Sequence, residues 1–384
     1  GQDLAELTDV QSFSLYRSET TRGNDTAESL LQRLGIADPQ AAAFLRSNDA
    51  MRQNVLGRAG RLVSAETTPD HQLSQLTVRW APNEDGTFQR LTVGRVEGKL
   101  QSKIETGKLT ASPRLAGGVI RSSFFAATDA ADIPDSVTLQ MSDIFQGDLD
   151  FRRGLRKGDR FAVVYESLEA DGEPLRAGRV LSTEFHNNGK THQAMWFQEA
   201  SKKGAYYTLD GKSLRQAYLN YPVEFSRISS GFSMRVHPIH KTWRAHLGTD
   251  FAAATGTKVR TVGDGTVSFA GVQNGYGNVI FGERANQQTT VYAHLSRIDV
   301  KQGQRVEQSD IIGAVGSTGW ATGPHLHFEF REKGEQRDPL TIAKITDAAQ
   351  PISKAARPAF DQMAAQMRIE LNAGTQSYAV ASAR

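Results

Sequence analysis

Histidine is concentrated in one stretch of this 384-residue chain, where six of its nine histidines lie between residues 237 and 327. Three short motifs in this stretch carry groups that can bind a metal: His246-Leu-Gly-Thr-Asp250, Tyr292-Ala-His294 and Pro324-His325-Leu-His327. Imidazole and carboxylate groups at such spacings can hold a transition metal and leave further imidazoles free for proton transfer. The pattern indicates a metal-dependent enzyme.

A β-rich domain is needed to bring these groups together. His325 and His327 alternate, so both side chains face one side of a strand. His246 and Asp250 are four residues apart, which places them on one face of a helix or of a strand, and Gly248 favours extended chain. Short β-runs separated by glycine-rich turns fill residues 225–331, so we expect an all-β domain with one cleft.

Isolated histidines usually pack in a core or lie at the surface, and that interpretation fits His71, His186 and His192, which are scattered in other segments. We assign these three residues no role. The same interpretation, a histidine that only packs or is exposed, fits residues 246–327 poorly, because five metal-competent side chains fall within that segment.

The motifs, in this order and spacing, resemble the lysostaphin-like (LytM-type) zinc endopeptidases of peptidoglycan. The sequence around them is similar as well, at Arg235-Val-His-Pro-Ile239, at Gly275-Tyr-Gly-Asn278 and over residues 317–329. The resemblance covers residues 227–330. It implies a zinc peptidase domain. The multi-domain layout of the chain also resembles that of the murein DD-endopeptidases of Gram-negative bacteria.

The resemblance also implies roles for individual residues. One Zn²⁺ per chain would be held by His246, Asp250 and His327, with water at the fourth position. His325 would be the general base and His294 the group that stabilises the oxyanion, although the sequence does not settle which histidine takes which role.

Three further residues belong to the family pattern near the rim of the cleft. His237, Tyr276 and Asn278 are our candidates for contact with substrate, and for His237 a packing role is an equal alternative. His240 is expected to be merely exposed.

Composition excludes several other classes of protein. The chain has no cysteine, so disulfides, thiolate zinc sites and a cysteine nucleophile are impossible. It has no Gly-x-Ser-x-Gly elbow, and Gly189-Lys-Thr191 lacks the first glycine of a phosphate loop. A formal charge of +3 without a basic stripe argues against a nucleic-acid partner. No apolar run reaches the roughly 18 residues of a transmembrane segment.

The pattern of elements predicts an α+β multi-domain chain with mixed α/β N-terminal domains, an antiparallel all-β peptidase domain and a C-terminal helix. We expect five segments: a lead-in at 1–23, a small α/β LysM-like module at 24–96, a mixed α+β domain at 97–204, the zinc peptidase domain at 205–345 and a helical tail at 346–384.

Local signals support these segments. Asp25-Thr-Ala-Glu28 is typical of a capping box that opens a helix, and Gly35 is a plausible end for it. His186-Asn-Asn-Gly189 predicts a tight hairpin turn. In the tail, Phe360, Met363, Met367 and Leu371 share one helical face before Gly374.

The function predicted from the resemblance is hydrolysis of the D-alanyl–diaminopimelate cross-link of peptidoglycan stem peptides. One alternative is cleavage of glycine-rich bridges. Another, from a different class, is a metal-free LytM-like protein that binds and activates a cell-wall amidase, but such proteins lack ligands that this chain retains. We expect a periplasmic or cell-envelope location in a Gram-negative bacterium, with the signal or anchor absent from this chain.

Restraint of a wall hydrolase is also expected, by a regulatory protein partner or by the chain itself. A carboxylate from the N-terminal region could occupy the fourth zinc position, with Glu66, Glu84 and Asp85 as candidates. Residues 23–36 resemble the helix of a LysM-like module, for which glycan binding is a hypothesis and scaffolding the alternative.

Overall fold

The computed structural model describes residues 14–151, 154–224, 248–285, 287–337 and 351–382, with only the backbone described for residues 236–237 and 378–382. The chain divides into two compact units: Gly1–Ser112 with Ser167–Ala177, and Pro113–Glu166 with Gly178–Arg384. Antiparallel sheets dominate both units, helices accompany them, and a long helix follows the last sheet. The predicted α+β multi-domain class is confirmed.

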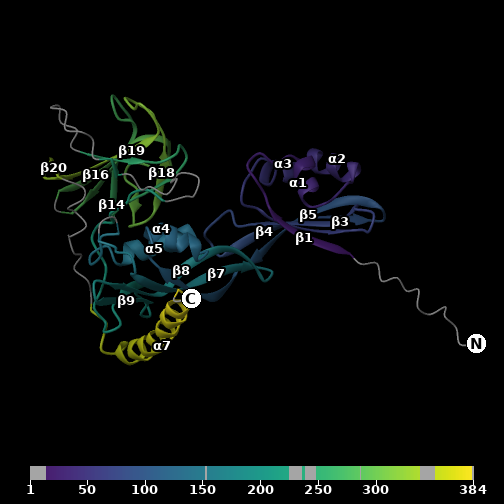
Figure 1. Ribbon diagram of the computed structural model, residues 1–384. Helices are drawn as coiled ribbons and strands as arrows, with labels where there is room; N and C mark the ends of the chain where they lie inside the picture. Colours follow the sequence, from purple (N-terminus) through teal and green to yellow (C-terminus); the bar gives the residue numbers. More distant parts are fainter. Residues whose placement is uncertain are drawn as a thin grey trace, which may run out of the picture. The chain divides into compact units, whose positions relative to one another are not determined.

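The first unit is an antiparallel sheet with three helices over one face (Figure 1). The strands lie in chain order: β1 (Leu15–Thr20), β2 (Leu62–Thr67), β3 (Leu73–Trp80), β4 (Thr87–Val96) and β5 (Lys99–Lys108). The helices are α1 (Ala27–Arg33), α2 (Pro39–Ser47) and α3 (Asp49–Asn54). Their apolar side chains, among them Leu30 and Leu45, form one core with Leu76 and Val93 of the sheet.

The predicted capping box at α1 is displaced by one residue. Thr26 Oγ1 accepts a hydrogen bond from the Ser29 amide at 3.1 Å, and Ser29 Oγ accepts one from the Thr26 amide at 2.9 Å. Asp25 instead accepts a bond from the Arg22 amide at 2.7 Å, because it precedes the cap. The predicted end at Gly35 is confirmed by its φ of 71°, the left-handed conformation that closes many helices.

A second sheet begins the other unit, in the order β10-β9-β8-β7-β6. Its strands are β6 (Thr110–Val119), β7 (Arg160–Ala170), β8 (Glu173–Asn187), β9 (Lys190–Phe197) and β10 (Ala205–Tyr207), and its helices are α4 (Phe124–Ala130) and α5 (Asp135–Ile144). The predicted turn between β8 and β9 is confirmed, with φ of 52° at Asn188 and 73° at Gly189. In the core, the Phe124 ring packs edge-on against Phe161 and Phe185, and the rings of Phe161 and Phe185 are stacked on each other.

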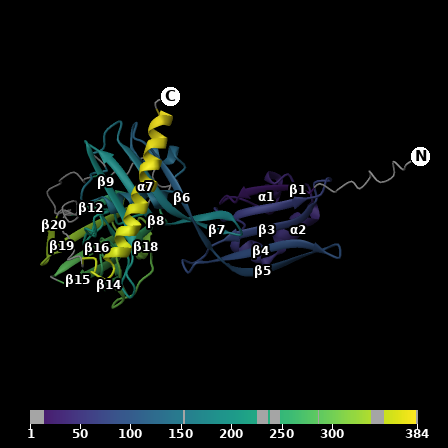
Figure 2. The same cartoon turned by 90° about the horizontal axis from the view of Figure 1, so that it is seen from below.

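The C-terminal helix α7 (Arg357–Ser382) runs beside β8 and β9 (Figure 2). Phe360 and Leu371 are fully buried, as the predicted face requires, whereas Met363 is 38% exposed. The helix continues past Gly374 to Ser382. A Cβ at Gly374 would lie 2.9 Å from Leu115 Cδ1, so this glycine lets the helix approach β6 closely.

The largest sheet of the second unit has ten strands. Seven follow the order β11-β12-β19-β16-β15-β14-β17, β13 pairs with β18, β18 also pairs with β16, and β20 pairs with β19. The strands are β11 (Val236–His237), β12 (Thr249–Ala252), β13 (Lys258–Arg260), β14 (Gly265–Gln273), β15 (Gly277–Arg284), β16 (Gln288–Ile298), β17 (Arg305–Val306), β18 (Ile311–Val315), β19 (His325–Glu332) and β20 (Glu335–Arg337). This is the antiparallel domain expected from the glycine-rich alternation.

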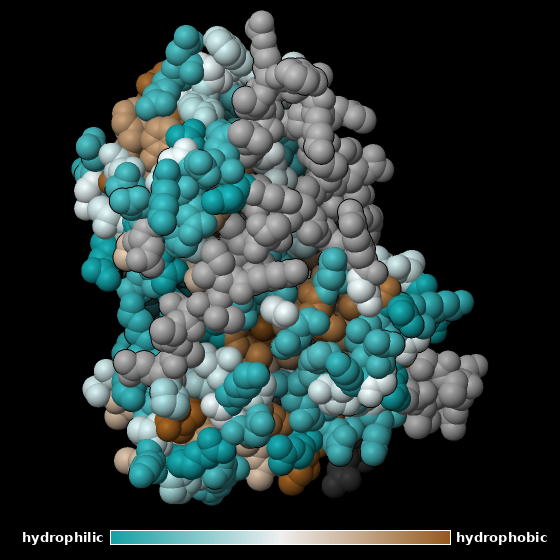
Figure 3. Space-filling view, turned by 90° about the vertical axis from the view of Figure 1, so that its left-hand side faces the viewer, coloured by the Kyte–Doolittle hydropathy of each residue, from teal (hydrophilic) through white to brown (hydrophobic). Residues whose placement is uncertain are grey.

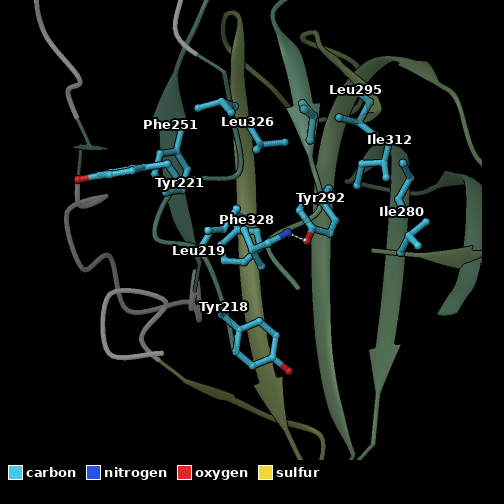
Figure 4. Close-up of a cluster of buried hydrophobic side chains, with 14 of the residues drawn as sticks. Tyr218, Leu219, Tyr221, Phe251, Ile280, Tyr292, Leu295, Ile312, Leu326 and Phe328 are labelled. Atoms are coloured by element: carbon cyan, nitrogen blue, oxygen red, sulfur yellow. Dashed lines mark hydrogen bonds between the residues drawn. The ribbon is translucent and has the colours of Figure 1, made fainter. Parts of the chain in front are cut away.

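Aromatic and aliphatic side chains together fill the core of this sheet (Figure 4). Tyr292 and Phe328, opposite each other in β16 and β19, have ring centroids 5.3 Å apart, and the Tyr292 hydroxyl accepts a hydrogen bond from the Val262 amide at 2.9 Å. Arg260, only 4% exposed, joins the sheet to α5 through a two-point ion pair with Asp143, at 2.7 and 2.9 Å. The core thus fixes the strands that carry the histidine motifs.

On the face shown in Figure 3, hydrophilic side chains prevail and hydrophobic ones reach the surface in a few groups. Among the residues that the structure describes, no helix is both long and apolar enough to cross a bilayer.

Burial along α7 gives a direct test of how the helix is held. Phe360 is fully buried, with ring centroids 5.1 Å from Phe197 and 5.9 Å from Tyr207. Phe360→Ala should lower the free energy of unfolding by about 3–5 kcal/mol, because it removes a core aromatic ring and leaves a cavity. Met363→Ala, on the exposed side, should change it by less than ~0.5 kcal/mol. Urea denaturation measures both, and equal effects would contradict the packing.

Candidate functional site

Three neighbouring strands bring the predicted site residues together. In the sheet, β19 lies between β12 and β16. Asp250 of β12 is opposite His327 of β19, and Ala293 of β16 is opposite the same histidine. His294 follows Ala293 directly, so three motifs that are far apart in sequence meet across paired strands.

The side chains of these strands converge. His327 Nδ1 lies 2.8 Å from Asp250 Oδ1, and His325 Nε2 lies 3.7 Å from Asp250 Oδ2. The His294 ring centroid is 4.8 Å from that of His325 and 5.9 Å from that of His327. Four of the five predicted metal and catalytic residues therefore form one cluster.

Two predicted residues are not placed in full. His246 lies outside the described residues. His237 is described only by its backbone, which pairs in β11 with Asp250. Their predicted roles stay predictions.

A buried carboxylate holds the other side of the His327 ring. Glu329, 3% exposed, places Oε1 2.9 Å from His327 Nε2. Its Oε2 accepts hydrogen bonds from Arg331 Nη2 at 2.7 Å and Gln336 Nε2 at 2.9 Å. Burial would raise the pKa of Glu329, but bonds from His327, Tyr276 and Arg331 outweigh it and lower that pKa to about 2.

The two carboxylates act on His327 together. Burial would lower the pKa of His327, but the bonds to Asp250 and Glu329 outweigh it and raise that pKa to about 9. With Nε2 bonded to Glu329, Nδ1 is the nitrogen directed to Asp250. Carboxylates commonly fix the orientation of metal-binding histidines in this way.

Tyr276 covers the His327 ring. Its own ring is nearly parallel to the imidazole, at 29° and 6.1 Å between centroids, and its hydroxyl donates to Glu329 Oε1 at 2.7 Å. Burial, together with the bond to Glu329, raises the pKa of Tyr276 to about 12. Tyr276 is therefore a neutral hydrogen-bond donor that braces the histidine and its carboxylate.

His294 occupies an unusual backbone conformation. Its φ is 62°, which is uncommon for a residue other than glycine, and it lies where the pairing of β15 with β16 shifts register. Its amide donates to the Tyr276 carbonyl at 2.8 Å. Strained positions of this kind often occur at functional sites.

The loop between β18 and β19 sets the tautomers of the two histidines that remain. His294 Nδ1 lies 2.7 Å from the Thr318 carbonyl, and His325 Nδ1 lies 2.8 Å from the Gly323 carbonyl. A carbonyl only accepts, so both Nδ1 atoms carry a proton, and when each ring is neutral its Nε2 atom has a free lone pair. Burial lowers the pKa of His294, which keeps that ring neutral at neutral pH.

Asn278 supports this arrangement from the side. Its side-chain Nδ2 donates to the Leu295 carbonyl at 2.9 Å, and its backbone amide donates to Thr318 Oγ1 at 3.1 Å. The side chain thus holds the backbone next to His294. Its predicted contact with substrate stays a prediction.

The donor set suits zinc. Within the described part of the chain, no group of three acidic or histidine residues is arranged to hold a metal, and the third predicted ligand, His246, lies outside that part. His327 Nδ1 and Asp250 Oδ1 face each other at 2.8 Å, against roughly 3.3 Å between ligand atoms of a tetrahedral zinc site. A small outward movement of either side chain would reach that spacing.

Sequence reasoning gave no role to Glu329 or to the carbonyls of Thr318 and Gly323. Glu329 follows His325 and His327 at intervals of two, so strand alternation could have placed it on the same face. The carbonyls carry no signal in the sequence, because every residue has one.

Comparison with known families agrees with this geometry. The profile of peptidase family M23 matches residues 244–339, which contain Asp250, His294, His325 and His327. DD-carboxypeptidase/endopeptidase Mpg of Neisseria meningitidis is 36% identical over 351 residues, spanning 90% of this chain and 81% of that protein. The chain belongs to peptidase family M23. A second profile, the Csd3 second domain, matches residues 107–234 of this M23 protein.

Other relatives of this M23 chain are similar over most of its length. Peptidoglycan DD-endopeptidase ShyC of Vibrio cholerae is 32% identical over 324 residues, or 83% of this chain and 72% of the relative. Among solved structures, Helicobacter pylori Csd3 is 23% identical and covers 94% of this chain and 96% of its own, with a TM-score of 0.39. The family profile and the identities to Mpg and ShyC confirm membership of the predicted family.

The hydrogen bonds to the loop carbonyls predict which nitrogen is protonated in each ring. We expect neutral His294 and His325 to be in the Nδ1–H form, although the Nε2–H form prevails in free histidine. Nitrogen-15 NMR of the labelled protein, assigned with His294→Gln and His325→Gln, reads the tautomer directly. Observation of Nε2–H in either ring would contradict the assignment of its carbonyl partner.

Proposed function

We propose that this M23 peptidase is a zinc-dependent peptidoglycan endopeptidase that hydrolyses D-alanyl–diaminopimelate cross-links between stem peptides. The observation that carries the proposal is the convergence of Asp250 and His327 beside two histidines whose Nε2 atoms are free to accept a proton. The relatives ShyC and Mpg, named as a peptidoglycan DD-endopeptidase and a DD-carboxypeptidase/endopeptidase, support the substrate.

Zinc would be held by His246, Asp250 and His327, with Glu329 fixing the His327 ring through Nε2. A bound zinc ion supplies Lewis-acid chemistry, which polarises a peptide carbonyl and makes water acidic near neutral pH. All other steps belong to side chains of this chain.

The two remaining histidines move the protons. His325 Nε2, 3.7 Å from Asp250 Oδ2, is next to the ligand pair and is placed to take a proton from the attacking water. His294 presents the same kind of Nε2, and a ring that has gained a proton can donate it to the oxyanion or to the leaving amine. The geometry suits either assignment of these two roles, so the assignment predicted from the sequence, with His325 as general base and His294 at the oxyanion, stays a prediction.

The finer predictions about the surroundings remain proposals. His237, Tyr276 and Asn278 are candidate contacts for the stem peptide, and the substrate implies a periplasmic or cell-envelope location. A regulatory protein partner stays a prediction. So does the LysM-like character of the N-terminal module.

Latency through an N-terminal carboxylate is likewise a proposal. Glu66 and Glu84 are exposed, and Asp85 accepts hydrogen bonds from both the amide and the hydroxyl of Thr87, at 3.1 and 2.6 Å. Because Asp85 is engaged within its own turn, the two glutamates are the better candidates to reach a zinc ion.

The first test is chemical. The metal-loaded protein should release stem-peptide monomers from a purified D-alanyl–diaminopimelate cross-linked dimer, as seen by mass analysis, and a chelator should abolish release until zinc is restored. A protein that binds no zinc, or that leaves every cross-linked murein intact while stimulating an amidase, would favour the metal-free activator. Release of products only from glycine-bridged walls would favour cleavage of glycine-rich bridges instead.

The second test separates metal binding from proton transfer. His246→Ala should lose zinc and activity together, because it removes a ligand. His325→Ala should keep zinc but lose about 100- to 10,000-fold in kcat, the usual contribution of a proton-transfer group. Elemental analysis and steady-state kinetics on the same dimer measure both properties. Loss of zinc in His325→Ala would make that residue a ligand instead.

A further inference from the structure

One tryptophan stands on the surface of the peptidase sheet. Trp320 is 79% exposed, the highest value among the large hydrophobic side chains that the structure describes. Trp80 is buried and Trp196 is half-buried. An exposed indole leaves a large apolar surface in water, so a ligand that covers it would gain binding energy.

The backbone that carries the indole is held by close contacts. The Trp320 amide donates to the Gly275 carbonyl at 2.9 Å, and its ring lies against Gly275, where a Cβ would be 3.4 Å from ring atom Cε3. Gly277 and Gly319, both with positive φ, approach so closely that a Cβ on Gly319 would meet the Gly277 amide nitrogen. Two glycine turns therefore interlock, and Trp320 is preorganised before any ligand arrives.

The same loop orients the catalytic histidines. Residues 316–324 join β18 to β19, and within them the Thr318 carbonyl binds His294 and the Gly323 carbonyl binds His325. Trp320 lies between these two carbonyls in the sequence. Five residues of extended chain span at most about 17 Å, so the Trp320 Cα lies within that distance of the His325 Cα. The amide partner of Trp320, Gly275, precedes Tyr276, whose ring covers His327, so Trp320 lies at the rim of the candidate active site.

The chemistry around the indole favours a neutral, hydroxyl-rich ligand. The loop from residue 316 to residue 324 contains no charged side chain. Ser317 and Thr322, on either side of Trp320 in sequence, are exposed, and their hydroxyls form no hydrogen bond with any described residue. Stem peptides carry carboxylates and amines, which this loop cannot pair. A sugar ring offers hydroxyls at its edge and a face of C–H groups that packs on an indole.

We propose that Trp320, flanked by Ser317 and Thr322, forms a saccharide subsite that binds a sugar ring of the glycan strand whose stem peptide is being cut. This inference rests on the proposed function for its choice of substrate. An extended stem peptide of four residues spans about 14 Å, which is within the upper limit of about 17 Å on the separation of the Trp320 and His325 Cα atoms. The subsite would make the enzyme prefer cross-links still attached to glycan.

The experiment compares two cross-linked dimers that differ only in sugar: one with its disaccharides and one from which an amidase has removed them. Trp320→Ala should lower kcat/KM about tenfold on the first dimer, equivalent to ~1.4 kcal/mol, and leave the second unchanged. Trp320→Phe should keep most of the preference, because a flat ring remains. Ile369→Ala, which removes a 72% exposed side chain from α7, is the matched control and should change neither value.

Binding is measured separately, by NMR titration of the indole N–H signals with an N-acetylglucosamine tetramer. The signal lost in Trp320→Ala should be the one that shifts. An equal loss of kcat/KM on both dimers would assign Trp320 to the peptide and overturn the subsite, as would no loss on either. If the wild-type protein cleaves neither dimer, the proposed function fails, and the titration alone decides the subsite: a shift of the Trp320 signal supports it and no shift refutes it.

Discussion

His327 is held at both ring nitrogens by carboxylates, and the rest of the candidate site is arranged around that contact. Asp250 bonds Nδ1 from the adjacent strand, while Glu329 bonds Nε2 from two residues along the same strand. A buried Glu329 would be costly without partners, so Tyr276, Arg331 and Gln336 supply hydrogen bonds to it. The ring can therefore present one nitrogen, and only one, to a metal.

Strand register makes this contact possible. Strand β19 lies between β12 and β16. A shift of one residue in the β12–β19 pairing would turn Asp250 to the other face of the sheet, and the same shift in the β16–β19 pairing would displace the backbone that leads to His294. The aromatic core beneath, with Tyr292 opposite Phe328, resists such a shift because it would expose large apolar side chains. Packing and chemistry thus depend on the same hydrogen-bonded pairs.

Glycine turns complete the site where regular strands end. Gly277 and Gly319 interlock two loops, and the resulting backbone delivers carbonyls to His294 and His325. Carbonyls that fix the Nδ1–H tautomer leave both Nε2 atoms basic, which a hydrolytic mechanism needs. The same turns hold Trp320 at the rim, so orientation of the histidines and presentation of the indole come from one piece of backbone.

The sequence by itself determined the family, because three separated motifs stand in the order and spacing of the endopeptidases that it resembles, and it predicted the residue types of the site. It also determined the helix and hairpin boundaries that glycine fixes locally, at Gly35 and Gly189. It did not show that Gly374 allows a close approach of the C-terminal helix to Leu115. Only the tertiary structure decided that Glu329 orients His327 and that loop carbonyls set the tautomers. Those roles depend on distances between strands and loops that fold together, and a list of residue types contains no such distances.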